Sequence, residues 1–113
     1  MAKYLVLIYE NEENYANATE ADFKRIMEEH DAYPEKVTAL GGSVLGGNAL
    51  QPSNTATSIR GDVVTDGPFA ETKEVLGGYY LIEAEDLDQA LAIGKITPAG
   101  YGGVEVRPVM TFD

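Results

Sequence analysis

The chain contains one histidine, His30, and an imidazole is the side chain best suited to acid–base chemistry near neutral pH. It has no cysteine, so thiolate nucleophiles, disulfides and zinc–thiolate sites are excluded. No serine stands out as a nucleophile, and no phosphate-binding or dinucleotide-binding glycine pattern is present. If His30 is a catalytic residue, proton transfer or water-mediated chemistry is therefore the natural reaction class.

Two interpretations of His30 remain open from the residues alone. It falls seven positions after Phe23, on the apolar stripe of a predicted helix, so its ring should face the sheet. A histidine in that setting is either a hydrogen-bonded core residue or an acid–base catalyst. Tyr9, Tyr79 and Tyr80 are candidates to line a cleft between sheet and helix, although strand tyrosines also serve as packing residues with hydroxyls at the rim.

Length and composition predict a single globular domain that spans residues 1–113 and lies in the cytoplasm. Hydrophobic residues make up 44% of the 113, and no apolar run approaches the roughly 20 residues that a membrane span requires. Acidic residues number 19 against 8 basic ones, which gives a net charge of −11. This field repels phosphate backbones, so neither nucleic acid nor membrane is an expected partner. A single histidine excludes a multi-histidine metal centre within one subunit. A carboxylate site for a hard cation stays open, but no EF-hand-like ladder is present, so neither a metal nor a cofactor is expected.

The apolar periodicity predicts two helices and six strands. Strands are expected at residues 3–9, 43–50, 77–84 and 104–109, and a hairpin at 55–60 and 63–66 turns at Gly61-Asp62. Gly46 and Gly47 indicate a bulge or a close backbone approach in the second strand. Residues 11–18 are interpreted as a loop. Pro108 suggests that the last strand lies at a sheet edge.

Both helices have recognisable ends. Thr19 and Asp22 form a capping pattern before a stripe that reaches Leu40, and Pro34 should kink this helix or divide it in two. The second helix begins after Asp86 and runs to about Lys95. The side chains expected toward the core on this helix are Leu87, Ala90, Leu91 and Ile96.

The element order β-α-β-β-β-α-β predicts an α+β fold of ferredoxin-like topology with an added hairpin. Two helices can cover only one face of such a sheet. The strands at 3–9 and 77–84 are apolar on both faces, so a second copy packed sheet to sheet is the simplest cover, as a homodimer. The alternative is a second face that stays partly exposed, with its tyrosines tolerating water.

The segment DGPFAETKE (residues 66–74), followed by LGGY, resembles the signature of the DGPF-domain branch of the YCII-related family. The segments KYLVLIYE, LGGSVLGGNALQP and VEVRPV are also similar to this family, so the resemblance covers nearly the whole chain. It implies a ferredoxin-like dimeric α/β barrel. It also implies a catalytic pair between a histidine on the first helix and the aspartate that opens the motif, here His30 and Asp66. Such a carboxylate would fix the histidine tautomer and raise its pKa.

Two functions follow as expectations. The first is an enzyme that uses His30 and Asp66 on a small-molecule substrate, with Tyr9, Phe69, Tyr79 and Tyr80 binding it. The second is a non-catalytic small-molecule-binding or regulatory module, because the resemblance implies a link to extracytoplasmic-function sigma factors. Simpler roles stay open for two of these residues: Asp66 can close an Asx turn, and Phe69 can be a core anchor.

Overall fold

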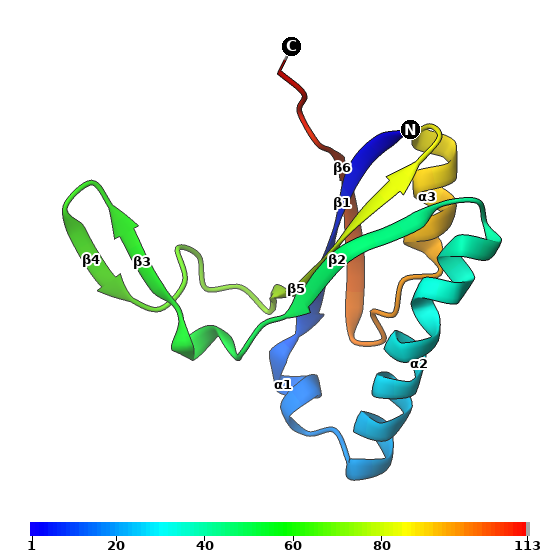
Figure 1. Cartoon of the computed structure of the whole chain (residues 1–113). Helices are drawn as coiled ribbons and strands as arrows, with labels where there is room; N and C mark the ends of the chain where they lie inside the picture. Colours follow the sequence, from blue (N-terminus) through cyan, green and yellow to red (C-terminus); the bar gives the residue numbers. More distant parts are fainter. Residues whose placement is uncertain (113) are drawn as a thin grey trace.

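The computed structural model of the chain describes residues 1–112 and has one main sheet of four antiparallel strands. In spatial order these are β2 (Ser43–Ala49), β5 (Glu74–Ala84), β1 (Ala2–Asn11) and β6 (Gly102–Pro108). Helices α2 (Glu20–Ala39) and α3 (Leu87–Lys95) lie together on one side of this sheet (Figure 1). The strand order and connections are those of the predicted ferredoxin-like fold.

A separate hairpin projects from the sheet on the side away from the two helices (Figure 1). It consists of β3 (Thr57–Arg60) and β4 (Val63–Asp66), and we call it the arm. Gly61 has φ +61° while Asp62 keeps a negative φ, so the hairpin turns at the predicted Gly61-Asp62 pair with the φ pattern of a type II′ turn. Within residues 1–112 the arm pairs with no strand of the main sheet.

Alternate residues of the central strands build the core between sheet and helices. On β1 the buried side chains are Tyr4, Val6 and Ile8, in the period-2 pattern of a strand. The other elements supply Tyr33, Val37, Ile82, Ala84, Ala90 and Ile93. The Thr97 hydroxyl donates to the carbonyl of Ile93 at 2.9 Å, so the buried Tyr33 hydroxyl donates to Thr97 at 2.7 Å.

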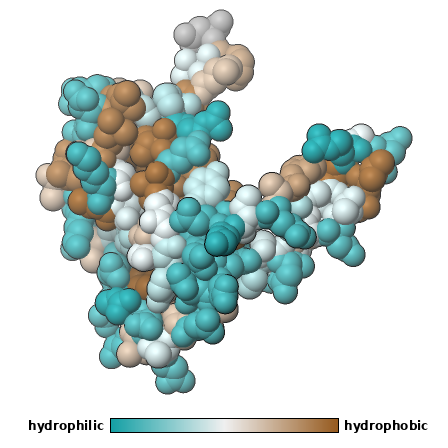
Figure 2. Space-filling model, turned by 180° about the vertical axis from the view of Figure 1, so that it is seen from behind, coloured by the Kyte–Doolittle hydropathy of each residue, from teal (hydrophilic) through white to brown (hydrophobic). Residues whose placement is uncertain are grey.

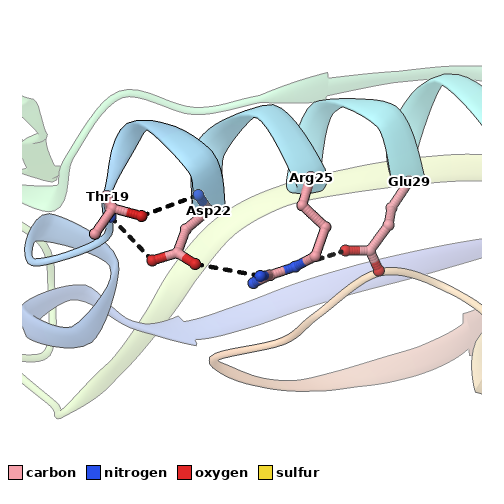
Figure 3. Close-up of polar contacts among 4 residues, drawn as sticks. All are labelled: Thr19, Asp22, Arg25 and Glu29. Carbon is pink, nitrogen blue, oxygen red and sulfur yellow. Dashed lines mark hydrogen bonds and ion pairs between the residues drawn. The ribbon is translucent and has the colours of Figure 1, made fainter.

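Helix α2 has the predicted ends. Thr19 Oγ1 accepts from the backbone N–H of Asp22 while the Asp22 carboxylate accepts from that of Thr19, a complete capping box (Figure 3). At the other end Gly41 has φ +92°, and the N–H groups of Gly41 and Gly42 donate to the carbonyls of Thr38 and Val37. This is a Schellman motif, which satisfies carbonyls that the helix end leaves free.

Three sequence-based expectations are wrong. The segment 11–18 contains a short helix, α1 (Glu12–Ala16), whose polar residues carry no apolar period to reveal it. Helix α2 is not divided at Pro34 but runs unbroken through it, and the missing N–H removes only the bond to the His30 carbonyl.

On α3, three of the four side chains expected in the core are 37–49% exposed: Leu87, Leu91 and Ile96. Ala90 is buried as expected, and Ile93 and Gly94 take the remaining buried positions. A Cβ on Gly94 would lie 2.8 Å from Val106 Cγ2, so the helix approaches the sheet along its smallest residues.

The sheet face away from the helices carries an apolar centre that no helix covers. Leu5, Leu7 and Tyr9 of β1 lie there beside Tyr79 and Leu81 of β5, and all five are partly exposed. Residues paired directly across antiparallel strands lie on the same face of a sheet. The pairing therefore places four charged residues on this face, around the apolar centre: Lys3, Glu83, Glu105 and Arg107. We call this surface the open face. It confirms that β1 and β5 are apolar on both sides.

None of the helices within residues 1–112 combines the length and apolar character needed to cross a membrane.

Candidate functional site

His30 pairs with a tyrosine on the central sheet. From its half-buried position on α2, its Nδ1 atom lies 2.6 Å from the hydroxyl of Tyr80 on β5. The two rings stack at 5.8 Å between centroids, and Tyr80 in turn packs against Tyr33 at 4.5 Å. A phenol therefore occupies the place beside the imidazole that the family resemblance assigned to a carboxylate.

Glycine on the neighbouring strand makes room for Tyr80. Gly47 of β2 pairs with Tyr80, and a Cβ built on Gly47 would lie 2.6 Å from Tyr80 Cδ1 and 2.6 Å from the Tyr79 carbonyl oxygen. Contacts of that length do not occur, so any side chain at Gly47 would displace the ring or part the strands. A Cβ on the adjacent Gly46 would meet nothing within 4 Å.

A cavity of about 50 Å³ lies beside the His30 ring, between α2, the end of β1 and the loop after α3. Its lining residues are Glu10, Arg25, Ile26, Glu29, His30, Pro98, Gly100 and Tyr101. Arg25 bridges two carboxylates of its own helix, at 3.2 Å to Asp22 and 3.7 Å to Glu29 (Figure 3). The cavity therefore takes a small polar group or a few waters, and its walls carry both signs of charge.

His30 and Glu10 are the two acid–base groups in this cavity, and burial brings their pKa values closer together. It lowers the pKa of His30, although Glu29 and Asp31 oppose the shift. It raises the pKa of Glu10. The pKa of Tyr80 is raised by burial and further by Asp31, which keeps this phenol protonated. A neutral imidazole near pH 7 beside a carboxyl of increased basicity is an arrangement common in acid–base active sites.

The bond to Tyr80 leaves Nε2 as the His30 nitrogen available to solvent or ligand. Within residues 1–112 no buried side-chain nitrogen or oxygen lacks a partner, and Nε2 makes no hydrogen bond, so Nε2 is accessible. When the Tyr80 hydroxyl donates to Nδ1, Nε2 carries the proton and is a donor. When Nδ1–H donates to Tyr80, Nε2 is a base.

The other residues predicted for the site lie elsewhere. Asp66 is exposed at the end of β4, on the arm, which projects away from the helix that carries His30 (Figure 1). Within one chain the predicted pair is therefore not brought together. Phe69 is 68% exposed, with the Arg60 guanidinium 4.9 Å above its ring.

The two remaining tyrosines lie on the open face. The Tyr79 hydroxyl accepts from Asn48 Nδ2 at 2.9 Å. Tyr9 lines an open groove of about 600 Å³ whose other lining residues are Thr72, Lys73, Glu74 and Glu105. Of the four residues predicted to bind substrate, only Tyr80 contacts His30.

Glu10 is the site residue that the sequence interpretation missed, although a signal for it exists. The buried side chains Tyr4, Val6 and Ile8 continue in steps of two to Glu10, which places this carboxylate on the helix-facing side of β1. A carboxylate in register with a buried row is an informative exception. Within residues 1–112 no cluster of three or more histidine, aspartate or glutamate side chains could hold a metal ion.

Comparison with known proteins places the chain in a family. The model of the YCII-related domain matches residues 2–113. The uncharacterised protein R00369 of Rhizobium meliloti (strain 1021) is 36% identical, over 96% of this chain and 93% of that protein. The chain therefore belongs to the YCII-related family.

Proposed function

We propose that this protein is an enzyme that transfers protons on a small polar molecule bound in the cavity beside His30. The observation that carries the proposal is the 2.6 Å contact between His30 Nδ1 and the Tyr80 hydroxyl, which orients an imidazole with Nε2 accessible. In this proposal His30 exchanges the proton with the substrate, Tyr80 is its positioning residue, and Glu10 is the second acid–base group. Asp66 takes part only if a second copy brings it to the cavity.

The lining of the cavity limits the substrate class. Glu10 and Glu29 face one guanidinium, that of Arg25, which is already engaged by carboxylates. An anionic group would be repelled there, so a neutral or cationic group such as a carbonyl, hydroxyl or amine fits better. A volume of about 50 Å³ admits this reacting group while the rest of the molecule stays outside.

The proposal is tested with three single variants and a small-molecule library. Binding is followed first through the ring signals of His30, the single histidine, and turnover is then measured for each ligand found. We expect His30→Gln to lower turnover by about 100-fold or more, because general acid–base groups contribute on that scale. Tyr80→Phe should lower it less and shift its pH profile. The control is Tyr79→Phe, the neighbouring tyrosine on the open face, which should change neither.

The competing expectation is a non-catalytic binding or regulatory module, with or without a sigma-factor partner. It uses the same cavity and predicts a ligand that perturbs the His30 signals and is never converted. Turnover that survives His30→Gln unchanged would instead overturn the role of His30 as the proton-transfer group.

The proposal includes a homodimer formed through the open face. Around its apolar centre, the two positive charges of Lys3 and Arg107 balance the two negative charges of Glu83 and Glu105. This surface is therefore neutral, although the chain has a net charge of −11. Glu105 and Arg107 already pair at 3.6 Å. Two copies of a strongly acidic chain can approach closely only through a surface of this kind, because charge repels them elsewhere.

A further inference from the structure

The two faces of the arm differ. Cross-strand pairing places Ile59 opposite Val64, and Thr57 opposite Asp66, on one face. The other face carries Ser58, Arg60, Val63 and Thr65. Ile59 and Val64 are 60% and 63% exposed, so the first face presents a bare aliphatic pair. Figure 2 shows hydrophobic side chains among the polar ones along the projecting arm.

The second face is already in use within its own chain. Ser58 Oγ donates to the carbonyl of Gly67 at 2.6 Å, and the Arg60 guanidinium lies over the ring of Phe69. The chain that returns from the arm therefore contacts Ser58 and Arg60 on this second face, while Val63 there stays 64% exposed. No hydrogen bond or cation–π contact within residues 1–112 engages the side chains of Ile59 and Val64 in the same way.

The root of the arm is held firmly, so the arm has a defined direction. The carboxylate of Glu12 on α1 accepts from both the backbone N–H and the hydroxyl of Ser53, each at 2.5 Å. These two bonds lower the pKa of Glu12. Where the arm closes, the N–H of Gly67 donates to the carbonyl of Ala56 at 2.7 Å.

An isolated two-stranded hairpin is at best marginally stable in water. This arm has strands of only four residues and, within residues 1–112, pairs with no strand of the main sheet, yet it projects an aliphatic pair into solvent. A fixed direction and a bare apolar face are what a recognition element requires, since pre-organisation lowers the entropic cost of binding.

We infer that the arm clasps a second copy of this chain, with the Ile59–Val64 face packed on the partner subunit. The inference rests on the homodimer proposed above. The open face as defined above has nine residues, whereas a stable interface uses roughly 20–30 on each side. The arm projects from the same side of the sheet as the open face and supplies further contact area (Figure 1). Twofold symmetry gives each dimer two such arms.

The first test is sedimentation of the wild type, of Ile59→Ser/Val64→Ser and of the control Val63→Ser over a wide concentration range. Val63 is 64% exposed on the opposite face of the same arm, so its replacement matches the chemistry but not the location. We expect the double variant to weaken dimerisation by about 100-fold or more, from the lost burial of two aliphatic side chains in each arm. The control should change it by less than about threefold.

The second test measures the environment of the arm directly. Because the chain has no cysteine, a single introduced cysteine can be labelled specifically. A fluorophore is attached to Val64→Cys or to Val63→Cys, and its emission is followed on dilution. We expect only the probe at position 64 to leave an apolar environment as dimers dissociate. Equal behaviour of both probes with an intact dimer would overturn the clasp alone. A wild type that stays monomeric at all concentrations would overturn the clasp and the homodimer together, leaving the His30 cavity untouched.

Discussion

At the scale of single residues, the chemistry of His30 depends on neighbours that are distant in the sequence. The helical stripe correctly predicted an imidazole turned toward the sheet, and its half-burial agrees with this. Tyr80 stands 50 positions further along and is one of two adjacent tyrosines, so periodicity alone could not show which one meets the helix. The two interpretations of His30 are compatible, because it is hydrogen-bonded to the sheet and also lines a cavity.

The titration of His30 can be measured directly by NMR, since the chain has no other histidine. We expect its pKa to lie below about 6.5, because burial disfavours the charged ring. The unfolded chain then binds more protons just below pH 6.5, so the free energy of unfolding falls as the pH drops through that value. Asp66→Asn should leave the titration unchanged. A pKa above 6.5 that falls in Asp66→Asn would instead support the pair implied by the family.

Glu10 should show the opposite pH dependence. Burial raises its pKa, so the folded chain binds more protons just above the ordinary value of 4.5 and stability falls as the pH rises through that window. Glu10→Gln removes this slope and should stabilise the protein at pH 7 by about 0.5 kcal/mol or less, because solvent screens a half-exposed carboxylate. Urea unfolding at pH 4.5 and pH 7 measures the difference. Glu13→Gln, on the exposed surface of α1, is the control, and an equal effect there would exclude burial as the cause.

At the scale of elements, strong local signals predicted most of the fold. The continuous apolar runs, the capping box at Thr19 and the Gly-Asp turn of the arm each act within a few residues. The second strand has the expected irregularity, but the register shift lies between Val44 and Gly46, just before the glycine pair, and Gly47 instead provides the close backbone approach. What failed depends on packing between elements: the buried row of α3 follows from the close approach of Gly94 to β6. Helix α1 is too short and polar to carry a period.

The two glycines of β2 should respond differently to alanine. Gly47→Ala forces a methyl group against the Tyr80 ring and the Tyr79 carbonyl, so we expect a loss of about 1–3 kcal/mol in stability. The His30 NMR signals should shift as Tyr80 moves. Gly46→Ala, which meets open space, should change stability by less than about 0.5 kcal/mol and leave His30 unchanged. Urea unfolding and the His30 spectrum test both, and indistinguishable variants would mean that Gly47 does not place the ring.

At the scale of the whole molecule, the open face and the outer surface of α3 are two exposed apolar regions with different expected roles. Leu7 lies in the apolar centre of the open face, and Leu91 is 43% exposed on α3. We expect Leu7→Asp to abolish dimers at micromolar concentration, because two buried carboxylates would face each other across the twofold axis. Leu91→Asp should have no effect. Sedimentation of both variants decides this, and a dimer lost only in Leu91→Asp would move the interface to α3.

In the proposed homodimer, the neutral open face on an acidic body also governs how quickly two copies meet. Each chain has a net charge of −11, so two copies repel each other. At low ionic strength this repulsion extends over a Debye length of about 30 Å and acts long before the neutral surfaces touch. At physiological salt this length shrinks to about 8 Å, so the barrier to encounter largely disappears. Salt should therefore accelerate association while leaving the dissociation rate nearly constant, the reverse of a pair of proteins that attract each other by opposite charge.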